Sequence, residues 1–349
     1  MPDTTYRGRR AVSIENGDLR VTVTREGGHI AEIFDKPAGV NPLWSPPWPS
    51  IEPSSYDAAR HPEYGGNAES KLLAGILGHN LCLDLFGGPS HEEAAAGMTV
   101  HGEASIAPYE ISAGQGELMM WTELPVAQLR FTRAVALDGR TVRILETVEN
   151  LSACDRPIAW TQHVTLGPPF LERGKTQFRT PATRSKVYEQ PFGAHDYLTP
   201  GAEFDWPMAP VAPWGPEDLR FLTRREHSCA FTTHLMDPGQ EDAFFVAFSP
   251  ACQLAFGYVW KQSDFPWLGI WEENHSRTSP PWNGNTLARG MEFGVSPIPE
   301  SRRAMIERGQ LFGVPGYRWL PAKSRLEAEY WAVMQSAVEG PETLARPRQ

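Results

Sequence analysis

The sequence contains few cysteines, and none of them form a closely spaced pair. It has no Cys-x-x-Cys element and no zinc-knuckle spacing, so nothing in it points to a cysteine-based metal site. Free thiols in a reducing compartment are the simplest expectation. The four cysteines are Cys82, Cys154, Cys229 and Cys252.

Long apolar runs are also missing. Runs such as LLAGIL and AFFVAF are far shorter than the roughly 20 residues that a transmembrane helix needs. The opening segment MPDTTYRGRRAVSIENG has no apolar stretch of the kind found in a signal peptide. We therefore expect a soluble, cytoplasmic protein without a membrane partner.

Positive charge is scarce. The chain has 32 Lys and Arg against 42 Asp and Glu, which gives a formal charge of −10 and a pI of about 5.5. Its densest basic cluster, YRGRR at residues 6–10, is short. This balance argues against nucleic acid and anionic membrane surfaces as partners.

Several common catalytic motifs are absent. The sequence has no G-x-S-x-G nucleophile elbow, no H-E-x-x-H zinc motif, no P-loop and no G-x-G-x-x-G after a strand. Candidate catalytic residues must therefore be sought among single polar residues in apolar surroundings.

Alternating apolar and polar residues dominate what is present. DLRVTVT (18–24) alternates with period two, and two apolar runs joined at Asp138-Gly139 indicate a hairpin. Short helices are expected at 67–79 and 300–310, and 324–336 fits either a strand or a helix. Prolines and glycines are spread along the chain, with no repeat and no clear boundary. The sequence thus predicts an all-β protein with a single domain spanning 1–349.

Aromatic residues are abundant, with 12 Trp, 16 Phe and 9 Tyr. Such a surplus suggests concave ligand surfaces as well as core. Two proline-rich loops carry tryptophans, Trp44 and Trp48 in the loop at 41–56 and Trp282 in the loop at 274–285. We expect these loops to line or rim a binding cleft.

Some histidines and glutamates stand inside apolar strand-like segments. The clearest are His101, His163, Glu292 and the adjacent Glu272 and Glu273. Strand alternation puts Glu292 on the face opposite Met291 and Phe293. Each could simply be a satisfied core or solvent-facing residue. In a cleft, a carboxylate with a raised pKa would suit a general base. A metal site is not expected, because no pair has typical ligand spacing. His79 and Asn80 in LGHNLC are the next candidates.

Four segments, in order along the chain, resemble the aldose 1-epimerase (galactose mutarotase-like) superfamily. They are IENGDLRVTVTREGGHIAEIFDKPAGVNPLW, VHGEA, WTQHVTLGPPF and GMEFGVSPIP. The resemblance implies a β-supersandwich with a sugar in a cleft on one broad sheet. It implies that Glu292 is the general base, that His163 is the general acid and that His101 hydrogen-bonds near the ring oxygen. No cofactor is implied. The remaining expected sugar contacts are His79, Asn80, Glu272, Trp271, Trp44 and Trp282.

The sequence also departs from the superfamily. An arginine expected before the His-Gly motif is missing from LGHNLCLDLFGG, and the nearest match to a substrate-binding aspartate is Glu272 or Glu273. The leading hypothesis is an isomerase that interconverts sugar anomers. A hexose-6-phosphate epimerase, which would need cations in the cleft, and a non-catalytic carbohydrate-binding protein stay as alternatives. A hydrolase or lyase using Glu272 with Glu273 is discounted, because neighbours on a strand face opposite sides. The sugar and the oligomeric state are left open.

Overall fold

The structure of the protein, a computed structural model, describes residues 4–347. Most of its regular elements are strands, which form one 11-stranded and one 8-stranded sheet. Neighbouring strands run antiparallel throughout both sheets. The prediction of an all-β architecture is confirmed.

The first sheet has the spatial order β1 (Thr4–Tyr6), β2 (Arg9–Glu15), β3 (Leu19–Thr24), β4 (Ile30–Asp35), β5 (His79–Leu83), β11 (Trp160–Leu166), β21 (Leu287–Gly294), β20 (Trp267–Asn274), β17 (Ser228–Met236), β13 (Ala182–Val187) and β14 (Glu203–Asp205). The second sheet has the order β12 (Gln177–Arg179), β18 (Asp242–Ser249), β19 (Leu254–Lys261), β25 (Arg325–Ser336), β9 (Thr141–Asn150), β8 (Leu129–Asp138), β7 (Glu117–Leu124) and β6 (Glu110–Ala113). Three small pairs are β10 (Arg156–Ile158) with β24 (Arg318–Leu320), β15 (Met208–Ala209) with β16 (Glu217–Asp218), and β22 (Gln310–Leu311) with β23 (Val314–Pro315).

Helices are short. They are α1 (Ser70–Leu73), α2 (His91–Ala95) and α3 (Arg302–Arg308), with 3₁₀ turns at Pro53–Ser55, Pro62–Tyr64 and Glu103–Ser105. The helix expected at 300–310 is confirmed as α3, whose N-cap Ser301 accepts a hydrogen bond from the Ala304 amide. The helix expected at 67–79 is limited to the single turn of α1, and β5 begins at His79. The ambiguous segment 324–336 is the strand β25. Among the described residues, no helix is long and apolar enough to span a membrane.

The largest apolar core lies between the two sheets and draws side chains from both. Strand β7 alternates strictly between exposed and buried positions, so this part of the second sheet has one face in solvent. By contrast, β11 and β20 are buried along their whole length. Their second face must therefore be covered by other parts of the chain. The assignment of 1–349 to a single domain stays a prediction.

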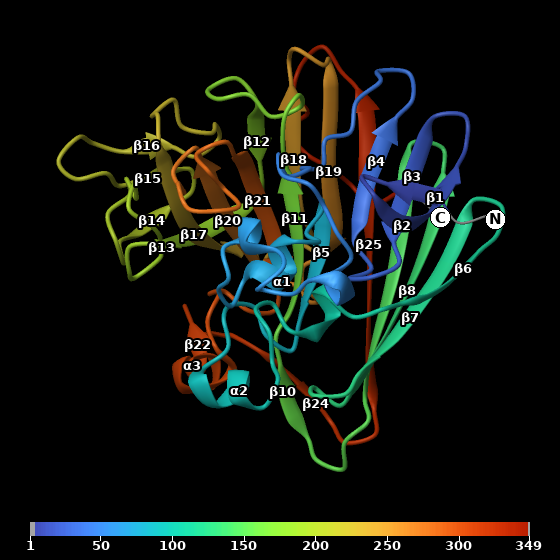
Figure 1. Ribbon diagram of the computed structural model, residues 1–349. Coiled ribbons are helices and arrows are strands. Elements are labelled where there is room, and N and C mark those ends of the chain that lie inside the picture. The colour runs from blue at the N-terminus through green and yellow to red at the C-terminus, as the bar shows by residue number, and fades with distance from the viewer. Residues whose placement is uncertain (1–3, 348–349) are drawn as a thin grey trace.

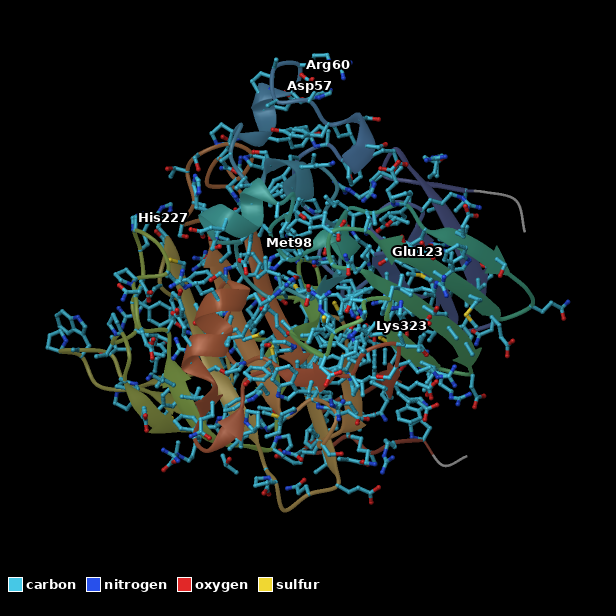
Figure 2. The ribbon with its side chains drawn as sticks, turned by 90° about the horizontal axis from the view of Figure 1, so that it is seen from below. Asp57, Arg60, Met98, Glu123, His227 and Lys323 are labelled. Atoms are coloured by element: carbon cyan, nitrogen blue, oxygen red, sulfur yellow. The ribbon has the colours of Figure 1, made fainter. Side chains whose placement is uncertain are left out.

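Loops and α1 cover this second face. Figure 1 shows α1 and the loops around it in front of β5, β11 and β21. Trp44, Trp48 and Leu72 from the covering segments form an apolar cluster with Phe231 and Trp271 of the sheet. The exposed ion pair of Asp57 and Arg60 marks the outer tip of the covering segment (Figure 2).

A buried ion pair lies behind β11, between the two sheets. Arg133 of β8 donates from Nε to Glu146 Oε1 of β9 at 2.7 Å, and both side chains are fully buried. The other carboxylate oxygen accepts from Trp160 Nε1 at 2.9 Å and from Gln162 Nε2 at 2.6 Å. Tyr330 OH lies 2.7 Å from Glu146 Oε1. The network fastens β11 to the second sheet, because burying both charges is tolerable only while they stay paired.

We expect Arg133→Met to destabilise the protein by about 3–5 kcal/mol, because it leaves the Glu146 carboxylate buried without its cation. Arg130→Met on the same strand is the matched control. Arg130 is exposed and pairs with Glu123 at 2.6 Å, so its loss should cost less than about 1 kcal/mol. Urea unfolding measures both, and equal costs would show that the buried pair does not hold the sheets.

Candidate active site

Strand register brings His163 and Glu292 together. His163 of β11 stands opposite Asn80 of β5 on one side and Glu292 of β21 on the other. Residues paired across antiparallel strands point to the same face. The neighbours of His163 in the chain, Gln162 and Val164, point the other way, into the core between the sheets. His163 and Glu292 therefore project from the covered face of the first sheet.

The two side chains are in contact. His163 Nε2 lies 3.2 Å from Glu292 Oε1, and the side chains are only 7% and 3% exposed. The other ring nitrogen, Nδ1, lies 3.2 Å from the hydroxyl of Thr165. With Nδ1–H donated to that hydroxyl, Nε2 is free to accept a proton from the carboxyl group. At this distance a proton can pass between the two groups.

Burial governs how this pair titrates. Burial raises the pKa of Glu292 to about 8. Burial, and then the nearby His101, lower the pKa of His163 well below its ordinary value of 6.5. Each shift disfavours the charged form. At neutral pH the pair thus carries one proton and no net charge.

Gly290 makes room for the Glu292 carboxylate. It lies two residues before Glu292 on β21 and therefore on the same face. A Cβ there would come within 2.4 Å of Glu292 Oε1 and 3.2 Å of the Trp271 Cβ. Any larger residue would displace the carboxylate from His163.

His101 reaches the same place from a turn. Its backbone is left-handed (φ 64°), and the next residue must be glycine because a Cβ on Gly102 would lie 2.1 Å from the Leu83 carbonyl oxygen. His101 Nδ1 is 2.5 Å from the Phe86 carbonyl oxygen. A carbonyl only accepts, so Nδ1 carries the proton and Nε2 is an acceptor. The His101 and His163 ring centroids lie 5.0 Å apart.

These groups line a cavity of about 180 Å³. Apolar and aromatic side chains form most of its wall, and a few polar groups converge on it, which is the usual character of a small-molecule site. Trp44 and Trp282 stack at 6.2 Å, and Trp271 meets Trp282 edge-on at 6.0 Å. The wall includes His101, His163, Glu292, Trp44, Trp271, Trp282, Phe192, Phe231, Glu69 and Arg277.

Of the expected site residues, Glu292, His163, His101, Trp44, Trp271 and Trp282 line the cavity. Trp48, which was expected beside it, packs behind Trp44 and Trp282 at 5.6 and 5.0 Å and donates to the Leu73 carbonyl at 2.8 Å. Sugar contact by these residues stays a prediction.

Two expected sugar contacts lie on the wrong face of the sheet. His79 is buried between the sheets, where its Nε2 lies 2.9 Å from Gln162 Oε1 and its Nδ1 lies 3.1 Å from Tyr258 OH. Glu272 is buried against Arg289 at 3.3 Å and accepts from Tyr197 OH at 2.6 Å. Both are already engaged away from the cavity, so direct contact with a ligand there is ruled out in this arrangement.

Asn80 is on the covered face but outside the cavity wall. It is fully buried, and its Nδ2 donates to Ser105 Oγ at 3.2 Å. Its side chain therefore joins β5 to the 3₁₀ turn at Glu103–Ser105 and does not line the cavity.

Sequence reasoning missed Arg277 and Glu69. Arg277 lies in the proline-rich loop that was expected to rim the site, but a loop arginine has no periodicity to distinguish it from a solvent-exposed one. Glu69 precedes α1 in a segment that carries no strand signal. Among residues 4–347, no group of three His, Cys, Asp or Glu side chains is placed to hold a metal ion.

No protein-family model and no curated protein matches this chain. Solved structures do share its fold. A candidate aldose 1-epimerase from Klebsiella pneumoniae superposes with a TM-score of 0.66 at 13% identity, over 95% of this chain and 80% of that one. A candidate aldose 1-epimerase from Escherichia coli K12 gives 0.63 at 12% identity, over 93% and 99%. A galactose mutarotase-like protein from Lactobacillus casei gives 0.59 at 14% identity, over 93% and 100%. The chain has the galactose mutarotase-like fold, as the sequence resemblance implied.

The raised pKa of Glu292 makes stability depend on pH. The folded protein keeps this proton up to about pH 8, whereas an unfolded glutamate releases it near 4.5. Between these values the folded state binds more protons at Glu292, so the contribution of this one group to stability should fall as pH rises, by at most about 1.4 kcal/mol per unit. Glu292→Gln removes this titration. Its stability relative to wild type should rise from about pH 5 to about pH 8 in urea unfolding. A difference that does not vary with pH would place the carboxylate in water.

Proposed function

We propose that this protein is an aldose 1-epimerase-like isomerase that interconverts the anomers of a sugar or sugar derivative by acid–base ring opening. The observation that carries the proposal is the 3.2 Å contact between His163 Nε2 and Glu292 Oε1 in the wall of one cavity. Fold neighbours described as aldose 1-epimerases support it at the level of the fold.

Ring opening needs one proton removed and one proton supplied. As the hydroxyl O1–H loses its proton, C1=O1 forms, the C1–O5 bond breaks, and O5 takes up a proton. A base and an acid on either side of the C1–O5 bond can do both. Rotation about C1–C2 and the reverse proton transfers then close the other anomer. The pair begins and ends with the same single proton.

In this proposal Glu292 is the base and His163 is the acid. The proton that the empty site holds on Glu292 must first move across the 3.2 Å contact to His163 Nε2. The resulting carboxylate stabilises the imidazolium beside it, and sugar hydroxyls that donate to the carboxylate favour the same form. His101, with Nε2 as its acceptor, holds the sugar by one of its hydroxyls.

The cavity wall suits a sugar as well. Sugars expose C–H faces that pack on aromatic rings, and their hydroxyls need polar partners. Trp44, Trp271 and Trp282 supply rings on the wall that also carries the polar groups. The cavity has room for one monosaccharide unit rather than a chain of them.

A non-catalytic sugar-binding protein is the second candidate, and the rate of anomer equilibration decides between the two. Cytoplasmic location and the expected lack of nucleic-acid and membrane partners stay predictions, and the oligomeric state stays open.

We expect Glu292→Gln and His163→Asn each to slow anomer interconversion by about 10²–10⁴-fold, because each removes one proton-transfer group and keeps a polar side chain. Binding should change much less. The double variant should lose less than the product of the two, since the groups act as a unit. Polarimetry of purified anomers, across a panel of free and phosphorylated sugars, measures the rates.

Glu123→Gln is the control for this series, because Glu123 is an exposed residue of β7 (Figure 2). A Glu292→Gln rate equal to that of wild type would show that Glu292 is not the base. A wild type that binds a sugar without exceeding the spontaneous rate would be the non-catalytic protein.

The rate should also have a bell-shaped dependence on pH. Above about pH 8 Glu292 loses its proton in the free enzyme, and the pair then has a base but no acid. At acidic pH, His163 takes up a second proton only well below pH 6.5, and the pair then has no base. Plots of kcat/KM against pH, which report the free enzyme, should therefore fall near pH 8 and again well below 6.5. These two values belong to the pair as a whole. A rate that is flat up to about pH 10 would contradict the shared-proton mechanism.

A further inference from the structure

Two charged side chains in the cavity wall have no part in the proton transfers. Arg277 comes from the loop after β20, and Glu69 comes from the turn that leads into α1. Arg277 NH1 lies 3.7 Å from Glu69 Oε2. His101 lines the same cavity as Glu69 and Arg277. A ligand in the cavity is therefore within reach of both charges.

Arg277 is held in place largely by aromatic faces. Its guanidinium carbon lies 4.7 Å from the Trp282 ring centroid and 5.6 Å from that of Trp271. Its backbone amide donates to Glu273 Oε1 at 3.1 Å, and its Nε lies 3.5 Å from Glu273 Oε2. The guanidinium lies 3.7 Å from Glu69 and 3.5 Å from Glu273, and both distances exceed the roughly 2.9 Å of a strong hydrogen bond. N–H groups of the guanidinium thus remain free for a ligand in the cavity.

The local charge is negative even so. Arg277 is the one cation among the described residues of the cavity wall, and Glu69 and Glu273 both lie against it. One guanidinium and two carboxylates leave a net charge of −1. An anionic group that approaches Arg277 must compete with both carboxylates, whereas a hydroxyl can accept from Arg277 and donate to Glu69 together.

We infer that the Glu69–Arg277 pair is a charge filter, in which Arg277 and Glu69 together bind hydroxyls of a neutral sugar while Glu69 excludes sugar phosphates and uronates. This inference rests on the proposed function and specifies its substrate class. Between the free and the phosphorylated sugars left open by the sequence, the filter selects the free sugar.

Glu69→Gln and Arg277→Gln test the filter through binding rather than catalysis. Titration calorimetry with D-glucose and D-galactose, against D-glucuronate and D-glucose 6-phosphate, gives a neutral-to-anionic affinity ratio for each variant. In wild type the ratio should favour the neutral sugar by about tenfold or more, the size of one screened charge at this range. Glu69→Gln should reduce that ratio by about tenfold. Arg277→Gln should weaken binding of the neutral sugar, because hydroxyl donors are lost.

Glu63→Gln is the matched control, because it removes the same charge from an exposed position nearby, outside the cavity wall. Its ratio should equal that of wild type. The filter is wrong if wild type binds the anionic sugars as well as the neutral ones or binds neither class. It is also wrong if Glu69→Gln leaves the ratio unchanged, or if Arg277→Gln weakens only the anionic sugars. If the affinity ratio favours the neutral sugar as expected but the protein does not accelerate anomer equilibration, the charge filter stands and the isomerase proposal is wrong.

Discussion

The buried pairing of Arg133 with Glu146 constrains which side chains β11 presents on the covered face of the first sheet. Through Glu146 it also holds Gln162 of β11. Side chains on a strand alternate, so fixing Gln162 toward the second sheet fixes His163 toward the cavity. A slip of β11 by one residue would exchange the two and bury His163 against the charged network. The placement of one cavity residue thus depends on a contact on the opposite side of its own strand.

The active-site candidates reach the cavity by different routes, and this affects how firmly each is held. His163 and Glu292 face each other across directly paired strands, so the sheet itself sets their separation. His101 depends on a left-handed turn and one carbonyl contact. Paired strands therefore hold His163 and Glu292 more firmly than the turn holds His101.

Strand alternation in the sequence was enough to predict an all-β fold and to mark His163 and Glu292 as unusual. It could not tell which face of the sheet each residue occupies. Alternation shows only that neighbouring residues on a strand point to opposite faces, whereas the pairing register decides which face meets the cavity. This is why His79, which stands opposite Val164 of β11 and not opposite His163, was wrongly expected in the cleft. The expectation that Glu272 lies in the cleft was wrong for the same reason. Its neighbour Glu273 faces the other way and pairs with Arg277. Arg277 itself depends on a loop conformation that no periodicity encodes.

The cover of the cavity is joined largely through stacked tryptophans, with Trp44 from one loop lying on Trp282 from the other. Contacts of this type draw their stability near room temperature mainly from water released by apolar surface, and they weaken on cooling. The sheet beneath is held by continuous ladders of backbone hydrogen bonds. The strands that carry His163 and Glu292 have these ladders in addition to their apolar core, so we expect cooling to loosen the cover of the cavity before the strands.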